Sequence, residues 1–200
     1  MMRGAERYRQ SLADTWRLLG SDIEAAAGQA AVFSGAHTSL VRRISIMLWP
    51  GGVCCFCYRL SHWAWLRQWF WLARLFHLVN YLLHKADISP AASIGPGLYI
   101  PHTVGVIVYG HAGSYLRVLA RAMMAPHGPR PSPCCSLDNA PVLGDQVTLG
   151  VDSVVVGAVR LGNAVRVGPG VLVARDVGAG VNLVSRVRTR IERQEEPCIV

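Results

Sequence analysis

Charged residues are scarce in this chain of 200 residues, because Asp, Glu, Lys and Arg together make up only 16% of it. Hydrophobic residues make up 52%, and the mean hydropathy is +0.29. A mainly disordered chain needs the opposite composition, with low hydrophobicity and high charge, so that class is excluded. The 20 glycines and 11 prolines indicate many tight turns and argue against an all-helical protein.

Long apolar segments are also missing. The apolar run from Ile44 to Tyr58 covers 15 residues and contains Pro50-Gly51-Gly52, whereas a membrane-spanning helix needs about 20. The start of the chain lacks the apolar core of a secretory signal and carries Arg3, Glu6, Arg7 and Arg9. These two features predict a cytoplasmic protein without a spanning helix.

The positive charge is unevenly distributed. The net charge of the chain is +8, of which residues 1–85 carry +6 and residues 86–200 carry +2. A basic N-terminal half suits nucleic acid, an anionic membrane or an acidic ligand, or simply aids solubility. No nucleic-acid motif accompanies it, so we expect no nucleic-acid partner. A peripheral membrane contact stays open because four tryptophans, Trp63, Trp65, Trp69 and Trp71, suit a membrane interface. The alternative is that they form the core of an oligomer.

The spacing of apolar residues predicts helices in the N-terminal part of the chain. Residues 5–26 show three-to-four spacing, residues 27–43 have the Ala-, Gly- and Ser-rich composition of a linker, and residues 53–84 suit one or two further helices. A break is expected at Trp49-Pro50-Gly51-Gly52. We therefore expect residues 1–85 to form a helical N-terminal domain with a role in oligomerisation.

The second half of the chain repeats every six residues. Eleven of the twelve positions in two runs are Ile, Leu or Val. The runs are Ile88, Ile94, Ile100, Val106, Ala112 and Val118, then Leu143, Leu149, Val155, Leu161, Val167 and Val173. A period of six fits neither a helix nor a plain strand, but it fits short strands joined by tight corners.

Three such units would close a triangular coil, and stacked coils would bury a continuous apolar core. The prediction is an α+β protein in which a parallel β-helix covers residues 86–184. The helical domain would cap one end and the tail, residues 185–200, the other. The phase of the repeat breaks between the runs, so residues 119–141 are expected to leave the wall as a loop. A divergent loop and a reading-frame error would both explain that stretch.

Three motifs are more selective than the repeat. They are Tyr-Arg-Leu-Ser-His-Trp at 58–63, Ala-Asp-Ile-Ser-Pro-Ala-Ala-Ser-Ile-Gly at 86–95, and Ile-Pro-His-Thr-Val-Gly-Val at 100–106. In order and spacing they resemble the serine acetyltransferase family, over residues 45–118 and 138–191. The resemblance implies a left-handed β-helix, a homotrimer or a dimer of trimers, and acetyl transfer from acetyl-CoA to the serine hydroxyl, the step that opens cysteine biosynthesis.

Acetyl transfer to an alcohol needs a base for the hydroxyl proton, stabilisation of the oxyanion and alignment of two substrates. By the resemblance, His102 is the catalytic base and then the proton donor to the leaving CoA thiolate. Asp87 is implied to be the carboxylate that orients this imidazole. Without the flanking motifs, His102 would be interpreted as a surface histidine.

Acetyl-CoA, as the co-substrate, needs backbone donors and positive charge for its phosphates. The resemblance implies a groove along the coils between two subunits, with contacts at Gly150, Val151, Arg166, Gly168 and Pro169. The alternative is that the glycines are only corner residues. We expect no metal, because the spacing of His102, His111 and His127 does not suit three converging ligands.

The sequence departs from the family pattern in three places. Pro101 precedes His102 where the family has Asp, Asn139-Ala140 stands where it has Arg-His, and a Glu is absent at residues 109–111. Since unpaired polar groups penalise binding, we expect the catalytic residues to be retained and the small-molecule hydroxyl acceptor to be altered. Two alternatives are acetylation of a sugar hydroxyl in surface-polysaccharide synthesis and a catalytically degenerate trimeric scaffold.

Overall fold

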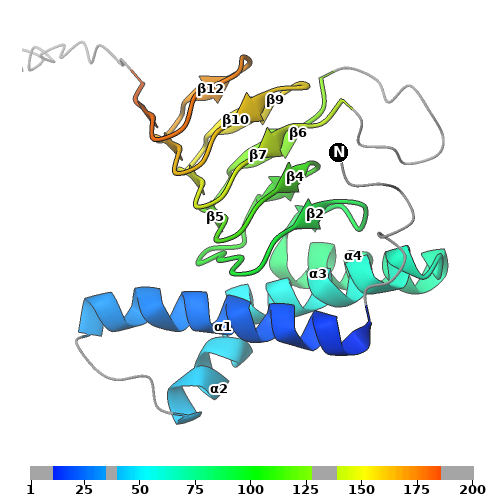
Figure 1. Cartoon of the computed structure of the whole chain (residues 1–200). Coiled ribbons are helices and arrows are strands. Elements are labelled where there is room, and N and C mark those ends of the chain that lie inside the picture. The colour runs from blue at the N-terminus through cyan, green and yellow to red at the C-terminus, as the bar shows by residue number, and fades with distance from the viewer. Residues whose placement is uncertain (1–10, 35–39, 128–138, 186–200) are drawn as a thin grey trace, which may run out of the picture.

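The computed structural model describes residues 11–34, 40–127 and 139–185. In these ranges, four helices are followed by a three-sided parallel β-helix (Figure 1). The helices are α1 (Leu12–Ser34), α2 (Leu40–Leu48), α3 (Pro50–Leu66) and α4 (Phe70–His84). They lie at the end of the β-helix where its first coil begins (Figure 1).

The helix boundaries differ from the sequence prediction at more than one place. The first helix, predicted over residues 5–26, begins at Leu12, and Ser11 lies outside it. The linker predicted at residues 27–43 is wrong, because α1 continues to Ser34 and α2 begins at Leu40. Alanines dominate residues 25–31, and their high helix propensity outweighs the single Gly28. The break expected at Trp49 is present, since Trp49 is extended and Pro50 opens α3, a position where the missing N–H of proline costs nothing.

The strands form three parallel sheets, here called sheets 1, 2 and 3. Sheet 1 holds β1 (Asp87–Ile88), β3 (Ile107–Val108), β6 (Met123–Ala125), β9 (Val154–Val156) and β12 (Leu172–Val173). Sheet 2 holds β2 (Ser93–Ile94), β4 (His111–Ala112), β7 (Val142–Leu143) and β10 (Arg160–Leu161). Sheet 3 holds β5 (Arg117–Val118), β8 (Thr148–Leu149), β11 (Arg166–Val167) and β13 (Asn182–Leu183).

The strand register shows that a regular coil consists of three repeat units, with exceptions at β3 and across the stretch between β6 and β7. Thr148 pairs with Arg166 and Val154 with Leu172, so each residue meets the one that lies three repeat units further along the chain. Ser93 pairs with His111 at the same spacing. Asp87, by contrast, pairs with Ile107, which lies two positions beyond that spacing. The extra length therefore belongs to the corner that precedes β3, and that corner contains His102. Ile107 pairs with Met123, two positions short of the regular spacing, and His111 pairs with Val142 beyond the stretch between β6 and β7.

The six-residue pattern correctly predicts the core. All six aliphatic residues of the second run are buried, and so are five of the first, with Ala112 half-buried. At the long corner the strand residue that faces inward is Val108, with Val106 buried beside it. The stacked coils therefore share one continuous apolar core.

The loop predicted at 119–141 begins later than expected. Residues Met123–Ala125 form β6 in sheet 1, and Met124 is fully buried. Met124 lies one repeat step after Val118, so the repeat continues once more, with a flexible Met in place of Ile, Leu or Val. The chain leaves the wall after β6 and returns at β7, where Val142 pairs with His111. Residues 128–138, with Cys134 and Cys135, lie outside the described ranges.

None of the helices in the described ranges combines the length and the apolar character needed to cross a bilayer.

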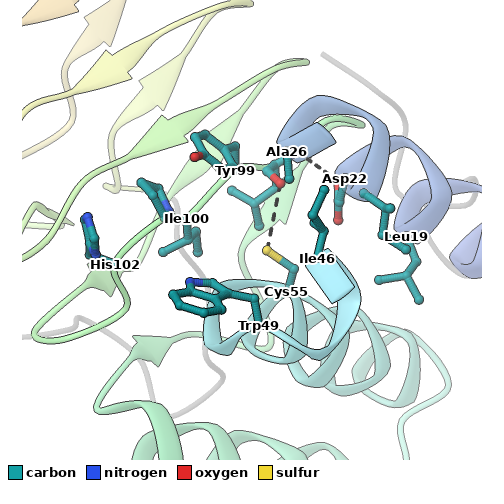
Figure 2. A pocket seen from close by; sticks show the side chains of 14 residues that line it. Leu19, Asp22, Ala26, Ile46, Trp49, Cys55, Tyr99, Ile100 and His102 are labelled. Atoms are coloured by element: carbon teal, nitrogen blue, oxygen red, sulfur yellow. Dashed lines mark hydrogen bonds between the residues drawn. The ribbon is translucent and has the colours of Figure 1, made fainter. Parts of the chain in front are cut away.

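The helices meet the first coil around a cavity. Residues of α1, α2 and the start of α3 form one side of it, and residues 98–102 form the other (Figure 2).

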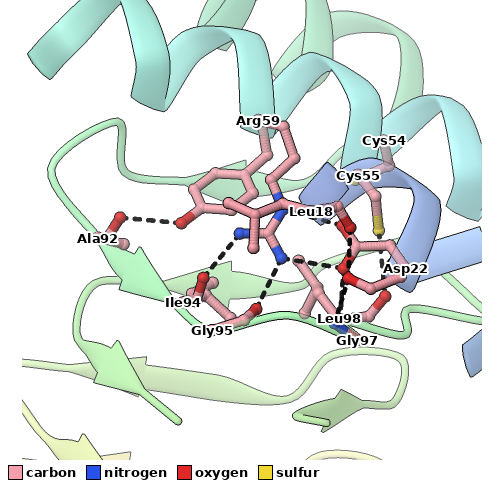
Figure 3. Close-up of polar contacts among 12 residues, drawn as sticks. Leu18, Asp22, Cys54, Cys55, Arg59, Ala92, Ile94, Gly95, Gly97 and Leu98 are labelled. Carbon is pink, nitrogen blue, oxygen red and sulfur yellow. Dashed lines mark hydrogen bonds and ion pairs between the residues drawn. The ribbon is translucent and has the colours of Figure 1, made fainter. Parts of the chain in front are cut away.

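A buried ion pair fixes this junction (Figure 3). Arg59 of α3 donates through Nε and Nη2 to the two carboxylate oxygens of Asp22 in α1, at 2.9 Å each. The same guanidinium donates to the carbonyl oxygens of Ile94 and Gly95 at 2.7 Å each. Asp22 in turn accepts a hydrogen bond of 2.7 Å from the backbone N–H of Leu98. One pair therefore ties α1 and α3 to the first coil.

We expect Arg59→Met to destabilise the protein strongly, because it leaves the buried carboxylate of Asp22 without its counter-charge. Removing one partner of such a pair costs about 3–5 kcal/mol. The matched control is Arg17→Met, which breaks an exposed pair with Asp14 and should cost at most about 1 kcal/mol. Urea denaturation at neutral pH measures both, and equal losses in the two variants would contradict the structural role of Arg59.

Candidate active site

One corner of the β-helix carries most of the residues singled out in the sequence. This corner, here called the ridge, joins sheet 3 to sheet 1 and comprises residues 101–105, 119–121, 150–152 and 168–170. Backbone hydrogen bonds stack its levels, from Arg121 N–H to Val104 O at 3.0 Å and from Gly170 N–H to Val151 O at 2.9 Å. His102 therefore lies on the same ridge as Gly150, Val151, Gly168 and Pro169.

The ridge glycines are required by packing between levels. A Cβ on Gly150 would lie 2.6 Å from the carbonyl oxygen of Val167, and one on Gly168 would lie 2.7 Å from that of Leu183. These contacts support the alternative that the glycines are corner residues. Their role toward acetyl-CoA stays a prediction.

Arg166 lies beside the ridge on the outer face of sheet 3. It is exposed, and its strand neighbour in register is Thr148, which pairs in turn with Arg117. Arg117 stacks over the ring of Tyr99 at 5.5 Å and donates to Gln29 at 3.1 Å. Two arginines thus share one face of the coil stack, and Arg166 presents its charge next to the ridge.

The corner that carries His102 is long and firmly attached. The imidazole is exposed, whereas the neighbouring Thr103 is buried. Gly105 N–H donates to Lys85 O at 3.0 Å, which fixes the far end of the corner. At its near end, Gly51 of α3 lies so close to Ile100 that a Cβ would overlap the carbonyl oxygen of that residue. The packing of α3 therefore sets the position from which His102 projects.

Asp87 is held by two side chains that the sequence motifs do not single out. Its Oδ1 accepts a hydrogen bond of 2.9 Å from Tyr109 Oη and lies 2.8 Å from Nε2 of His77. His77 comes from α4, shortly before Asp87 in the chain, and Tyr109 comes from the next coil. Asp87 and His102 border the same end of sheet 1, and the pairing of their side chains stays a prediction.

The cavity beside His102 has a volume of about 340 Å³. Figure 2 shows His102, Ile100 and Trp49 at one end and Leu19 of α1 at the other. The wall is mostly apolar, and its carboxylate, that of Asp22, is engaged by Arg59 and Leu98. No local sequence signal predicts this space, because three helices and a coil enclose it together.

The described cysteines do not supply a nucleophile. Cys54, Cys55 and Cys57 are buried thiols of α3, and burial raises the pKa of Cys54 to about 12. A neutral thiol is a poor nucleophile, and His102 stays the predicted base at this site. Among the residues that the structure describes, no group of three His, Cys, Asp or Glu is arranged to hold a metal ion.

Comparisons with known proteins agree with the motifs. No family model matches the chain. A serine acetyltransferase of Synechococcus elongatus is 28% identical over 141 residues, which are 70% of this chain and 56% of that protein. A serine acetyltransferase of Helicobacter pylori J99 is also 28% identical over 141 residues, covering 70% of this chain and 80% of that protein. This chain is homologous to serine acetyltransferases. It spans only about half of the Synechococcus relative.

Solved serine acetyltransferases share the fold. The native serine acetyltransferase 1 of Entamoeba histolytica superposes with a TM-score of 0.73 at 24% identity, covering 90% of this chain and 66% of that one. The enzyme of Neisseria gonorrhoeae gives a TM-score of 0.73 at 21% identity, covering 96% and 71%. The three-sided coil is therefore the left-handed parallel β-helix that the resemblance implied.

We expect Gly51→Ala to destabilise the protein by about 1–3 kcal/mol, because the added methyl group must push α3 away from Ile100. The control is Gly28→Ala in α1, where a Cβ meets open space and should stabilise the helix by about 0.5–1 kcal/mol. The free energies of unfolding of both variants test this. A neutral Gly51→Ala would show that the corner and the helix are not in tight contact.

Proposed function

We propose that this protein is an acetyl-CoA-dependent O-acetyltransferase of the serine acetyltransferase type. The observation that carries the proposal is the placement of His102: an exposed imidazole on the lengthened corner of a left-handed β-helix, on the same ridge as the predicted acetyl-CoA positions Gly150 and Gly168. The names of the homologous proteins support the same reaction.

In the proposed reaction, His102 takes the proton from the acceptor hydroxyl as its oxygen attacks the thioester carbonyl carbon. The tetrahedral intermediate collapses, the carbon–sulfur bond breaks, and the protonated imidazole returns the proton to the CoA thiolate. The acetyl group passes directly to the acceptor, so no covalent enzyme intermediate is needed. Asp87, held by Tyr109 and His77, would stabilise the charged imidazole.

Acetyl-CoA would lie along the ridge. Gly150 and Gly168 follow the strands of sheet 3 at successive levels, Val151 and Pro169 are exposed next to them, and Arg166 offers a cation beside them. A guanidinium suits phosphate through paired, charge-assisted hydrogen bonds. A groove between two subunits would complete the site in a homotrimer or a dimer of trimers. The exposed apolar residues of α4, such as Trp71, would suit burial in that assembly. We further propose a cytoplasmic location.

Replacing His102 by Ala should lower kcat about 10²–10⁴-fold, because the general base is lost, with a small effect on the KM for acetyl-CoA. The matched control is His127→Ala, since His127 is also exposed but lies beside Gly157, on a different corner. Release of CoA thiol in the presence of a hydroxyl acceptor measures both variants. Unchanged turnover in His102→Ala would overturn the assignment of His102 as the base. A biological activity that His102→Ala leaves unchanged, together with no thiol release by the unsubstituted protein, would favour the scaffold alternative.

We expect L-serine to be a poor acceptor. Pro101 and Asn139-Ala140 replace the polar residues that the resemblance implies for serine binding, and each missing partner costs about 1–3 kcal/mol. Asn139 is exposed, so Asn139→Arg can return one guanidinium and should lower the KM for serine. Steady-state acetylation of L-serine by the purified protein decides the point, and efficient turnover with a KM between micromolar and millimolar would contradict an altered acceptor.

A further inference from the structure

We propose that the cavity beside His102 binds the hydrocarbon body of the hydroxyl acceptor, and that the preferred acceptor is an uncharged alcohol with an aliphatic chain. The inference rests on the proposed acetyl transfer and names the class of substrate that the same site takes.

The size and position of the cavity suit such a ligand. Its volume of about 340 Å³ falls at the lower end of small-molecule sites, which span roughly 300–1,000 Å³. His102 lies at one end and Leu19 at the other, beneath α1 (Figure 2). An alcohol whose chain extends toward α1 therefore presents its hydroxyl to the imidazole.

The walls are chemically matched to a hydrocarbon. Leu19 and Ile23 of α1, Ile46 of α2, Trp49, and Ile100 of the first coil line the space. Burial of a hydrocarbon chain against apolar walls favours binding because it removes apolar surface from water. The favourable free energy is about 0.8 kcal/mol per buried methylene, which corresponds to roughly a fourfold gain in affinity. A longer chain should therefore bind better until the cavity is full.

The same walls are poorly matched to an amino acid. No Lys or Arg occurs among the described residues that line the cavity, so an acceptor carboxylate gains no cation there. The two oxygens of Asp22 are already bound by Arg59 and Leu98 N–H, which leaves little for an ammonium group. The Cys55 thiol points to Leu98 O, and burial raises its pKa well above the usual value, so it stays neutral. A zwitterion in this space would be poorly compensated.

The positions of the cavity and of the predicted acetyl-CoA residues relative to His102 favour the acceptor, and not the acyl group, as the ligand of the cavity. The predicted acetyl-CoA positions belong to later coils, beyond His102. The cavity lies on the opposite side, between the first coil and the helices. The two substrates would thus reach the imidazole from opposite sides.

The test is thiol release by the full chain with acetyl-CoA and the acceptors ethanol, 1-butanol, 1-hexanol and L-serine. We expect kcat/KM to rise at least tenfold from ethanol to 1-hexanol, through KM, and L-serine to lie below 1-hexanol. Ala26 lines the cavity, so Ala26→Leu fills part of it. This variant should lose the rise in kcat/KM with chain length while it still acetylates ethanol. Ala13→Leu, on the same helix at an exposed position, should keep the gain.

Three results would overturn the assignment. One is a flat response to alcohol length, and another is L-serine turned over better than every alcohol. The third is a preference for octanoyl-CoA over acetyl-CoA that Ala26→Leu removes, because the cavity would then hold the acyl chain. If no acceptor releases thiol, the proposed function fails. A shift in the emission of Trp49 on addition of 1-hexanol, referenced to Trp49→Phe, then tests the cavity separately. Failure to bind there overturns the cavity assignment as well.

Discussion

The contact between Arg59 and Asp22 determines how the two halves of this protein meet. A buried ion pair seldom adds net stability over well-packed apolar residues. Its hydrogen bonds have strict geometry, however, and here they reach α1, α3, Ile94, Gly95 and Leu98 from one guanidinium and one carboxylate. The junction is thereby held in one arrangement, and both the cavity and the corner bearing His102 depend on that arrangement.

The regular coils and the long corner before β3 differ in what they require of the sequence. Stacked coils of three repeat units need only aliphatic residues that face inward and corners that pack closely. Before β3 the chain is longer than this pattern requires, and there it exposes an imidazole while Thr103 stays buried. Local departures from an ideal pattern often mark functional positions. The rigid levels above and the packed Gly51 below keep this departure from becoming a mobile loop.

The parts of the fold that could be predicted well are those governed by local pattern. The six-residue repeat identified the buried residues because every coil imposes the same inward position. The repeat was lost at Met124 because a search for branched aliphatic residues passes over Met, and the helical residues near Gly28 were misinterpreted because glycine signals a linker. Both errors arose from the type of a single residue. At Met124 the six-residue spacing itself continues.

Other features have no local signal. The contact of Asp87 with His77 and Tyr109 joins a helix, a strand and the following coil, and the distances along the chain follow no period. The cavity arises only when α1, α2 and α3 pack on the first coil. The departures at Pro101 and Ala140 suggested an altered acceptor, but they could not indicate its chemistry, because the walls that bear on that question are far apart in sequence.

The return of the chain to the β-helix at β7 has a consequence for the evolution of this protein. Val142 pairs directly with His111 although most of an extra coil's worth of sequence separates β6 from β7. Since closing a longer loop costs little additional entropy, insertions, deletions and substitutions in that stretch can occur while the neighbouring coils keep their strand register. Sequence changes can therefore accumulate at the corner between sheets 1 and 2 without altering the ridge, which borders the other edge of sheet 1.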